Sequence, residues 1–331
     1  MTDEKTIKIR YQKLISIINK HNLLYHTYDS PQISDSEYDD LYKELKTIES
    51  NSPKIITINS PSQRVGSTLL NYFEKVKHDI PMLSLSNAAD ESEFEDYYVR
   101  TTKALSLSNI ELFAEPKFDG LAISITYIDG KFDKAVTRGD GYIGEDVTQN
   151  VKTIKSLPLL LKDKRLPNKF TLKGEVFIDK KDFETINNEL DIKGDKQYSN
   201  PRNLAAGSIR QLDPLIASMR NLKLFIHGIS DYEKFIHINK HDILIKYLKN
   251  LGFPINKYYR VLKDLGSSIN YFNEMNKTRD TLPYEIDGLV YRVNNLTKYK
   301  SLGFTSKAPK WAIAYKFKAL EALTRINDVT F

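Results

Sequence analysis

Apolar side chains near the N-terminus recur at three- and four-residue steps. The positions are Ile7, Tyr11, Leu14, Ile15, Ile18 and Tyr25. Because this spacing gives a helix one buried stripe, the pattern predicts a long amphipathic helix. The sequence breaks at residues 29–31 (DSP), and a second helix is then predicted to carry Tyr38, Leu41, Tyr42, Leu45 and Ile48.

The start of the second helix carries its own signal. Residues 34–37 (SDSE) match a capping box, and Ile33 and Tyr38 are placed to form a hydrophobic staple across it. Residues 1–65 are therefore predicted to form a helical hairpin domain, too small to bury much core alone and expected to dock on the rest of the chain. Residues 50–67, rich in Ser, Asn and Pro, are predicted to be a connector.

Period-two alternation marks the strands of the second part of the chain. Ile123, Ile125 and Tyr127 alternate with polar residues, and Asp129-Gly130 supplies the dipeptide of a tight hairpin turn. Further strands are predicted at 171–178, 222–229, 286–293 and 311–318, and helices near 180–190, 202–212 and 241–251. Since helices and strands do not alternate strictly, we predict an α+β fold with mainly antiparallel sheets over residues 66–318.

Composition excludes several kinds of chemistry. The 331 residues include no cysteine, which rules out disulfides, zinc ribbons and thiol nucleophiles within the chain, and the six histidines lack metal-ligand spacing. The formal charge of +6 suits a polyanionic partner without requiring one. The charged N-terminus lacks the apolar core of a signal peptide, so we expect a cytoplasmic protein without a membrane partner.

Lys117 stands two residues before an Asp-Gly pair in the string AEPKFDG (114–120). A lysine amine can form covalent intermediates, but only after desolvation or a neighbouring cation has weakened its hold on the proton. So short a string also describes an ordinary surface lysine.

Five motifs in order along the chain supply a context for this lysine. They are EPKFDG (115–120), TRGDG (137–141), KGEVF (173–177), DGLV (287–290) and AYKFK (314–318). The series resembles the covalent nucleotidyltransferases, which include DNA ligases, RNA ligases and capping enzymes. Four further stretches look like bacterial NAD⁺-dependent DNA ligase: 25–39 (YHTYDSPQISDSEYD), 61–67 (PSQRVGS), 81–88 (PMLSLSNA) and 200–214 (NPRNLAAGSIRQLDP).

The resemblance implies a reaction centred on Lys117. Lys117 would attack the α-phosphorus of NAD⁺, expel nicotinamide mononucleotide (NMN) and become lysyl-AMP, with Mg²⁺ offsetting phosphate charge. Asp119 would assist the lysine and the leaving group, and Lys316 would neutralise phosphate charge as it develops. The other residues implied to hold the adenosine half are Ser84, Leu85, Glu115, Arg138, Glu175, His227, Asp287 and Arg292.

The helical hairpin acquires a role from the same resemblance. Tyr25, His26, Asp35, Tyr38 and Asp39 would grip the NMN half, with aromatic faces stacking on its cationic ring. Each has a simpler alternative: Tyr38 as a packing residue, His26 as a satisfied polar side chain, and the two aspartates as groups that favour a helix N-terminus through its dipole.

Two positions depart from the family pattern. Arg292 stands where the family carries a lysine. Its guanidinium keeps the positive charge, but its planar shape and fixed donors differ from the compact ammonium group of a lysine. His227 stands where a tyrosine is expected to stack on the adenine; an imidazole stacks over less area, and an ordinary strand histidine is the alternative. Arg202 and Arg210, on one side of a predicted helix, are expected to contact DNA phosphates, the alternative being a solvated basic face.

A complete enzyme of this family continues into an oligonucleotide-binding (OB) domain, a zinc finger, helix-hairpin-helix repeats and usually a BRCT domain. Residues 319–331 are predicted to be the linker and the start of that OB domain, and Zn²⁺ is expected only in such further domains. We therefore expect an excised, monomeric fragment that adenylates itself with NAD⁺ but seals nicked double-stranded DNA poorly. An ATP-dependent ligase or capping enzyme and a non-catalytic, basic nucleic-acid-binding module remain the alternatives.

Overall fold

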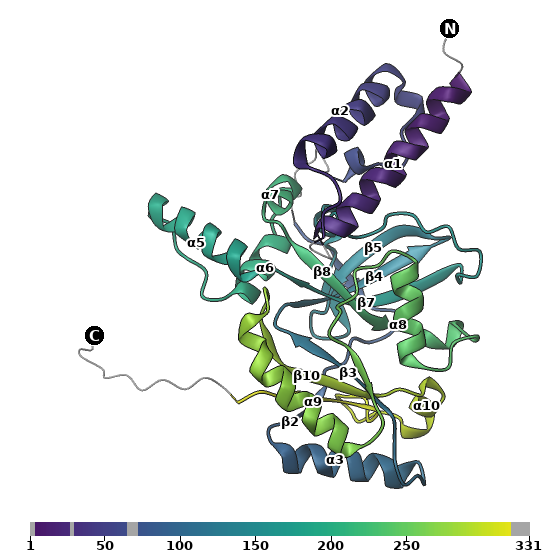
Figure 1. Cartoon of the computed structure of the whole chain (residues 1–331), viewed down its shortest axis with the longest axis vertical. Coiled ribbons are helices and arrows are strands. Elements are labelled where there is room, and N and C mark those ends of the chain that lie inside the picture. Colours follow the sequence, from purple (N-terminus) through teal and green to yellow (C-terminus); the bar gives the residue numbers. More distant parts are fainter. Residues whose placement is uncertain (1–3, 27–29, 65–71, 319–331) are drawn as a thin grey trace.

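The computed structural model describes residues 4–26, 30–64 and 72–318. A helical hairpin lies at one end, and the sheets with their surrounding helices form the rest of the molecule (Figure 1). The predicted OB-domain segment at 319–331 lies outside the described residues, as does the predicted junction between the first two domains at residue 65. None of the described helices combines the length and the apolar character needed to cross a membrane.

The N-terminal helical module consists of α1 (Glu4–His26) and α2 (Asp35–Asn51), followed by the short 3₁₀ helices η1 (Pro53–Ile55) and η2 (Pro61–Gln63). Its small core is formed by Tyr11, Leu14, Ile15, Ile18 and Leu45. The predicted capping box is confirmed: the Ser34 side chain accepts a hydrogen bond from the Glu37 backbone N–H, and the Glu37 carboxylate accepts one from the Ser34 backbone.

Arg64 joins this module to the sheets. Its guanidinium donates to the carbonyl oxygens of Ile154 and Leu157, both at 2.9 Å, and to Asn19 Oδ1 on α1 at 3.3 Å. Arg64 is buried, and burial lowers its pKa to about 10. The connector predicted at 50–67 therefore contains Arg64, whose side chain contacts both the helical module and the domain of the sheets.

A four-stranded antiparallel sheet has the order β5-β4-β7-β8. Its strands are β4 (Leu121–Ile128), β5 (Lys131–Thr137), β7 (Lys169–Phe177) and β8 (Lys223–Ile229). The predicted hairpin between β4 and β5 is confirmed, with φ of 49° at Asp129 and 73° at Gly130. Positive φ at both central residues matches the right-handed twist of the strands that the turn connects.

A five-stranded sheet, β2-β11-β10-β3-β9, faces the first one. Its strands are β2 (Ser86–Ala88), β3 (Leu112–Phe118), β9 (Arg260–Leu262), β10 (Ile286–Val293) and β11 (Ala312–Lys316). All pairs in it are antiparallel except β2 with β11. A separate pair joins β1 (Lys75–Lys77) to β6 (Ile143–Glu145). The α+β prediction with mainly antiparallel sheets is thus confirmed.

The remaining helices surround the sheets. They are α3 (Glu91–Ala104), α4 (Thr148–Lys152), α5 (Lys180–Lys193), α6 (Pro201–Ile209), α7 (Pro214–Met219), α8 (His241–Asn250), α9 (Leu265–Thr278) and α10 (Tyr299–Leu302), with the 3₁₀ helices η3 (Tyr232–Lys234), η4 (Arg279–Thr281) and η5 (Leu296–Lys298). The helix predicted at 202–212 is shorter than expected: α6 ends at Ile209, and α7 begins afresh because Asp213 caps it and Pro214 starts it.

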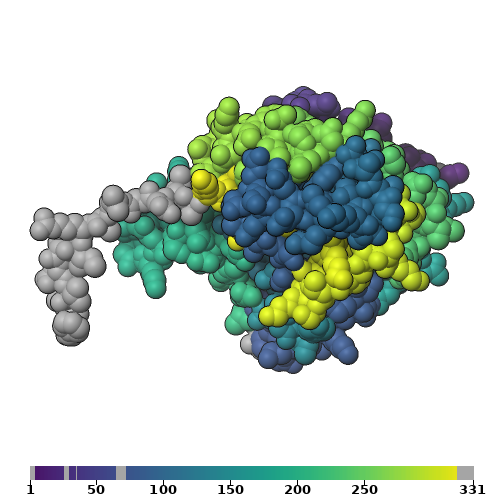
Figure 2. Space-filling view, turned by 90° about the horizontal axis from the view of Figure 1, so that it is seen from below, coloured from purple at the N-terminus to yellow at the C-terminus, as the bar shows by residue number. Residues whose placement is uncertain are grey.

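Aromatic packing ties the five-stranded sheet to the helices that cover it. Phe94 of α3 stacks on Tyr315 with a centroid distance of 5.0 Å, and Phe272 of α9 stacks on the same ring at 3.6 Å. Figure 2 shows this end of the molecule, where α3 lies between α9 and the C-terminal strand region. The five-stranded sheet is therefore packed against α3 and α9 on one of its faces.

Candidate active site

A cavity of about 530 Å³ opens between the two sheets. Strands β3, β7, β8, β10 and β11 line it, together with the segment 80–85. Of the residues predicted to hold the adenosine half, the structure brings all but Asp287 to its wall: Ser84, Leu85, Glu115, Arg138, Glu175, His227 and Arg292. Lys117, Lys316, Arg202 and Arg210 line it as well.

Lys117 lies on β3 at the place where the pairing with β10 becomes irregular. Its strand partner is Gly288, and the register shifts between Ile286 and Gly288. Asp287 lies at this irregularity and accepts hydrogen bonds from Lys117 Nζ on both carboxylate oxygens, at 2.9 and 2.8 Å. The Lys117 side chain is 25% exposed, so the amine is held in place yet open to a ligand.

A second lysine approaches the same carboxylate. Lys316 Nζ, at the end of β11, lies 3.9 Å from Asp287 Oδ2. Asp287 thus lies behind the two amines and holds both at the cavity wall. Asp287, which was predicted to hold the adenosine half, thus contacts Lys117, the predicted nucleophile.

Gly288 allows β10 and β11 to approach closely at this point. A Cβ atom on Gly288 would lie 2.2 Å from the backbone oxygen of Tyr315. Real Cβ atoms essentially never come that close to a backbone atom, so only glycine fits here without moving the strand that carries Lys316.

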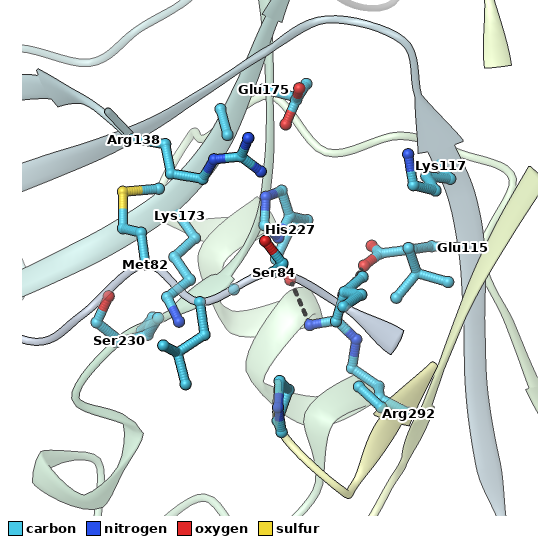
Figure 3. Close-up of a pocket in the computed structure, with 18 of the residues that line it drawn as sticks. Met82, Ser84, Glu115, Lys117, Arg138, Lys173, Glu175, His227, Ser230 and Arg292 are labelled. Atoms are coloured by element: carbon cyan, nitrogen blue, oxygen red, sulfur yellow. Dashed lines mark hydrogen bonds and ion pairs between the residues drawn. The ribbon is translucent and has the colours of Figure 1, made fainter. Parts of the chain in front are cut away.

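Carboxylates and arginines face Lys117 across the cavity. Arg202 donates to Asp119 at 3.2 Å, and Glu175 on β7 lies beside Arg138 (Figure 3). Burial raises the pKa of Glu175 to about 8, against the opposing effect of Lys117, Arg202 and Arg138. Arg210 pairs with Glu145, with Nε 2.6 Å from a carboxylate oxygen. The two predicted DNA-contacting arginines therefore both lie at this cavity, each paired with an acid.

Arg292 and Glu115 form a buried ion pair deep in the cavity. Arg292 also donates to the backbone oxygen of His227 at 3.3 Å. Burial raises the pKa of Glu115 to about 7, although Arg292 opposes the shift. Burial, Arg292 and Lys173 lower the pKa of His227 to about 3, so its imidazole is neutral near pH 7. The two departures from the family pattern thus lie in contact with each other.

The sequence reasoning missed several residues of the cavity. Lys173, two positions before Glu175 on β7, points into it (Figure 3), and burial lowers its pKa to about 8. Five polar atoms of the cavity-lining residues have no hydrogen-bond partner within the described part of the chain: Ser230 Oγ, His241 Nε2, Arg292 Nε, Tyr299 Oη and Trp311 Nε1. Unpaired buried polar atoms favour a polar ligand or water at this end. Of these residues, Arg292 was predicted and Lys173 lay in the Lys173-Gly174-Glu175 motif, whereas no motif signalled Ser230, His241, Tyr299 or Trp311.

The residues predicted to grip NMN lie elsewhere. Tyr25, Tyr38 and Asp39 line a second cavity, of about 350 Å³, which has no lining residue in common with the first. Tyr38 donates to Asn22 at 2.8 Å, and burial raises its pKa to about 12. The side chains of His26 and Asp35 lie outside the described residues, while their backbones lie in α1 and at the start of α2. The structure therefore does not bring the two predicted halves of the NAD⁺ site together.

Potential metal ligands are sparse. Within residues 4–26, 30–64 and 72–318, no group of three or more His, Asp and Glu side chains is arranged to hold a metal ion. Glu115 and Glu175 are the carboxyl groups among the residues that line the first cavity, and burial raises the pKa of both, whereas Asp119 does not line it and pairs with Arg202. One or two carboxylates plus substrate phosphates are the usual ligands of Mg²⁺, so Asp119 is the carboxylate that fits a magnesium ion brought with a nucleotide.

The chain matches two families along almost its whole length. Residues 4–66 match the family described as DNA ligase-like, N-terminal NAD⁺-binding domain, and residues 70–320 match the NAD-dependent DNA ligase adenylation domain. It is 42% identical to a DNA ligase of Nitrosococcus oceani over 97% of this chain and 48% of that protein. DNA ligases of Clostridioides difficile and Brevibacillus brevis are 41% and 43% identical over 98% and 99% of this chain and 47% and 48% of theirs.

The chain thus spans about half the length of the curated relatives it matches. The match begins in the helical module and continues through both sheets. This chain belongs to the NAD-dependent DNA ligase family and contains its adenylation domain.

Proposed function

We propose that Lys117 is the nucleophile that takes AMP from NAD⁺. Its Nζ attacks the α-phosphorus, a nitrogen–phosphorus bond forms, the bond from phosphorus to the bridging oxygen breaks, and NMN leaves with that oxygen. Before the attack, the amine must leave Asp287, which holds it through both carboxylate oxygens, and give a proton to that carboxylate. The observation that carries the proposal is a lysine held by the carboxylate of Asp287 at the wall of a nucleotide-sized cavity.

We assign the other residues of the first cavity by what they can donate or accept. Asp119 assists the amine and the leaving group, and Lys316 and Arg138 offset phosphate charge. Glu175 accepts from the ribose, and Glu115 with Arg292 meets the polar edge of adenine while the His227 ring stacks on its face. Ser84, Leu85 and Asp287 complete this site, with Asp287 acting through the two lysines.

Magnesium is proposed as the companion of the nucleotide. Asp119 would hold it beside the phosphates, and it would neutralise charge that develops on the leaving phosphate. The arginines and lysines of the cavity contribute to the same neutralisation from fixed positions.

The helical module supplies the contacts to the NMN half. The rings of Tyr25 and Tyr38 offer faces for the cationic pyridinium, and Asp39 offers a carboxylate. His26 and Asp35 are proposed for the same group. In this proposal residues 1–65 form the NMN-binding domain, 66–318 the nucleotidyltransferase domain and 319–331 the start of an OB domain.

In a complete enzyme the AMP would pass from Lys117 to the 5′-phosphate of a DNA nick, and the 3′-hydroxyl would then displace it. Arg202 and Arg210 are proposed to contact the nicked duplex by exchanging Asp119 and Glu145 for DNA phosphates. We propose that the protein acts as a monomer in the cytoplasm and that this chain alone seals nicks poorly.

Intact-mass spectrometry after incubation with NAD⁺ and Mg²⁺ tests the first step. We expect a gain of one AMP with NAD⁺ and none with ATP, and no gain in the Lys117→Ala variant. Lys180→Ala, which removes an amine of similar exposure outside the cavity, is the matched control and should gain AMP normally. A gain with ATP alone, or no gain in a folded chain freed of AMP, would contradict the proposal.

A further inference from the structure

A buried histidine lies directly behind Arg138, one of the cations of the first cavity. His78 follows β1 and precedes residues 80–85 of the cavity wall, and it is only 8% exposed. The reaction proposed above assigns it no role, and no motif signalled it in the sequence. The contacts of its imidazole indicate what it holds in place.

Both ring nitrogens of His78 are engaged. Nε2 lies 3.1 Å from the carbonyl oxygen of Thr137 and 3.2 Å from that of Arg138. Because carbonyl oxygens only accept hydrogen bonds, Nε2 is the donor to both. Nδ1 lies 3.3 Å from Ser124 Oγ. The imidazole therefore connects β4, which carries Ser124, to the end of β5 and to the turn that follows it.

Backbone hydrogen bonds hold the segment of His78 against the same turn. The His78 N–H donates to the carbonyl oxygen of Tyr142, and the Met82 N–H donates to that of Gly141, both at 2.8 Å. These bonds do not depend on which side chain stands at position 78. A substitution there therefore tests the bonds of the imidazole alone.

Arg138 depends on its backbone for its position in the cavity. Its N–H donates to the carbonyl oxygen of Ala122 at 2.9 Å, and its own carbonyl oxygen accepts from Gly141 at 3.0 Å as well as from His78. Its side chain extends into the cavity near Glu175 (Figure 3). Within residues 4–26, 30–64 and 72–318, its guanidinium donates no hydrogen bond and forms no ion pair, and it acts on Glu175 only at longer range. Whatever fixes the backbone of Arg138 therefore also aims its guanidinium.

We propose that His78 is a positioning residue of the adenylation reaction, which holds the backbone of Arg138 so that its guanidinium meets the phosphates of NAD⁺. The inference rests on the proposed function, in which Arg138 offsets phosphate charge. A fixed cation stabilises a transition state most when it needs no reorganisation as the charge develops. Without the imidazole, the carbonyl oxygens of Thr137 and Arg138 lose a donor and the Arg138 backbone can shift, and small misplacements cost rate steeply.

A purely structural role for His78 makes a different prediction. If His78 only stabilised the fold, its loss would weaken every property of the cavity together. The positioning role confines the loss to the phosphate side of the cavity. The maximum rate of lysyl-AMP formation should fall, because a contact that strengthens in the transition state is lost. The affinity for adenosine, which carries no phosphate, should stay the same.

Glutamine and asparagine at position 78 separate the two roles. The amide nitrogen of glutamine reaches the place of Nε2 and can donate to the same carbonyl oxygens, whereas that of the shorter asparagine cannot. Mass spectrometry over a series of NAD⁺ concentrations would give the maximum rate of AMP transfer in a single turnover, and calorimetry would give the affinity of the AMP-free chain for adenosine. We expect His78→Asn to lower the maximum rate about tenfold, the effect of one lost hydrogen bond to a buried group. His78→Gln should stay within about threefold of the wild type, with adenosine affinity unchanged in both variants.

His237→Asn is the matched control, because His237 is exposed and lies outside the first cavity. It should change neither the rate nor the affinity. An undiminished rate in His78→Asn, an equal loss in His78→Gln, or a loss of adenosine affinity as large as the loss of rate would overturn the inference.

Thermal unfolding would show which variants are folded at the temperature of the assay. If His78→Asn does not fold, Ser124→Ala takes its place. This variant removes the hydroxyl at Nδ1 and leaves the ring free to turn, so the maximum rate should fall about threefold, and an unchanged rate would overturn the inference. The proposed function is judged separately, by the AMP gain of the wild-type chain. A wild-type chain that gains AMP from NAD⁺ while His78→Asn reacts equally fast would retain the function and refute the role of His78.

Discussion

The two cavities are built in different ways. Around Lys117, strands from two sheets carry most of the side chains, and three cations meet a carboxylate: Lys117 with Asp287, Arg292 with Glu115 and Arg202 with Asp119. At the module junction, helices and the loops beside them carry the side chains, and the buried cation Arg64 meets carbonyl oxygens and an amide oxygen. The first cavity is supported within one domain, and the second depends on contact between two parts.

This difference matches what each cavity is proposed to do. A reacting amine needs its partners fixed before the substrate arrives, because misplacement costs rate steeply. A site that must take up and release a leaving group gains from an attachment that can be broken. A guanidinium is bound less strongly by neutral carbonyls than by a carboxylate. The contacts at the module junction are therefore weaker than the ion pairs around Lys117.

The largest expected effect comes from Gly288→Ala, which should break the first cavity and spare the second. The new Cβ would meet the Tyr315 backbone oxygen and push β11 away from β10. We expect a loss of about 2–4 kcal/mol in the free energy of unfolding and no AMP adduct by mass spectrometry, with NMN binding preserved at a temperature where the variant is folded.

Gly266→Ala is the matched control for this prediction. Gly266 lies in α9 with only a side-chain oxygen at 3.8 Å from the built Cβ, and alanine favours a helix by up to about 1 kcal/mol over glycine. A Gly288→Ala chain as stable and as active as Gly266→Ala would refute the close-approach argument.

Arg64→Met should produce the converse result. It leaves the carbonyls of Ile154 and Leu157 without their donor, at a cost of roughly 1–3 kcal/mol, and frees the module. We expect weaker NMN binding and faster protease cleavage between module and sheets, while AMP binding at the Lys117 cavity stays unchanged.

Arg10→Met is the control for Arg64→Met, because it tests whether the loss of any arginine of the module would also speed protease cleavage. Arg10 pairs with Glu44 on the surface of the module and takes no part in the junction, and exposed pairs contribute about 0–1 kcal/mol. Equal protease sensitivity of the two variants would show that Arg64 does not hold the parts together.

The smallest expected effect is a pH dependence of the free energy of unfolding, which comes from the buried acid Glu175 of the first cavity. The pKa of Glu175 is raised by burial to about 8 from an ordinary value of 4.5. The folded state therefore keeps a proton that the unfolded state has lost, and its contribution to stability, complete below pH 4.5, is lost as pH rises through about 8. We expect Glu175→Gln to reduce this fall by about 1–2 kcal/mol.

Urea unfolding from pH 4.5 to 8.5 would measure this effect. Glu184→Gln, an exposed position on α5, should follow the wild-type curve. If the free energy of unfolding of the wild-type chain rises from pH 4.5 to 8.5 in parallel with that of Glu175→Gln, the protonated state assigned to Glu175 is wrong.

Local signals predicted much of the fold. The helical hairpin, its capping box, the Asp129-Gly130 turn and the strands β4, β7, β8, β10 and β11 follow from periodicity and turn chemistry, because these act over a few residues. The short strands β6 and β9 were missed. The helices α3 and α9 were missed although each begins with a capping aspartate, Asp90 and Asp264. Strand β3 was also missed, since the charged residues Glu115 and Lys117 interrupt its apolar run.

The candidate site depends on contacts that no local pattern contains. Asp287 was assigned to the nucleotide, but its contact with Lys117 spans 170 residues and arises from an irregularity in strand register. Arg64 lies in a stretch that the sequence marked as a connector and as a family resemblance, but neither signal predicted its role at the junction. Its partners there include backbone carbonyls, and because every residue has one, no side-chain pattern identifies them. The separation of the NMN residues from Lys117 depends on how the domains dock, which the motifs do not specify.

The bidentate contact of Lys117 with Asp287 also bears on side reactions. Lys117 Nζ lies 2.9 and 2.8 Å from the two carboxylate oxygens of Asp287, and its side chain is only 25% exposed, so the empty protein keeps this amine in a shielded position. Aldehydes, activated esters and other lysine-modifying agents should therefore label the exposed surface lysines before Lys117. In the proposed reaction, the nucleotide must displace the amine from Asp287 before the amine can attack.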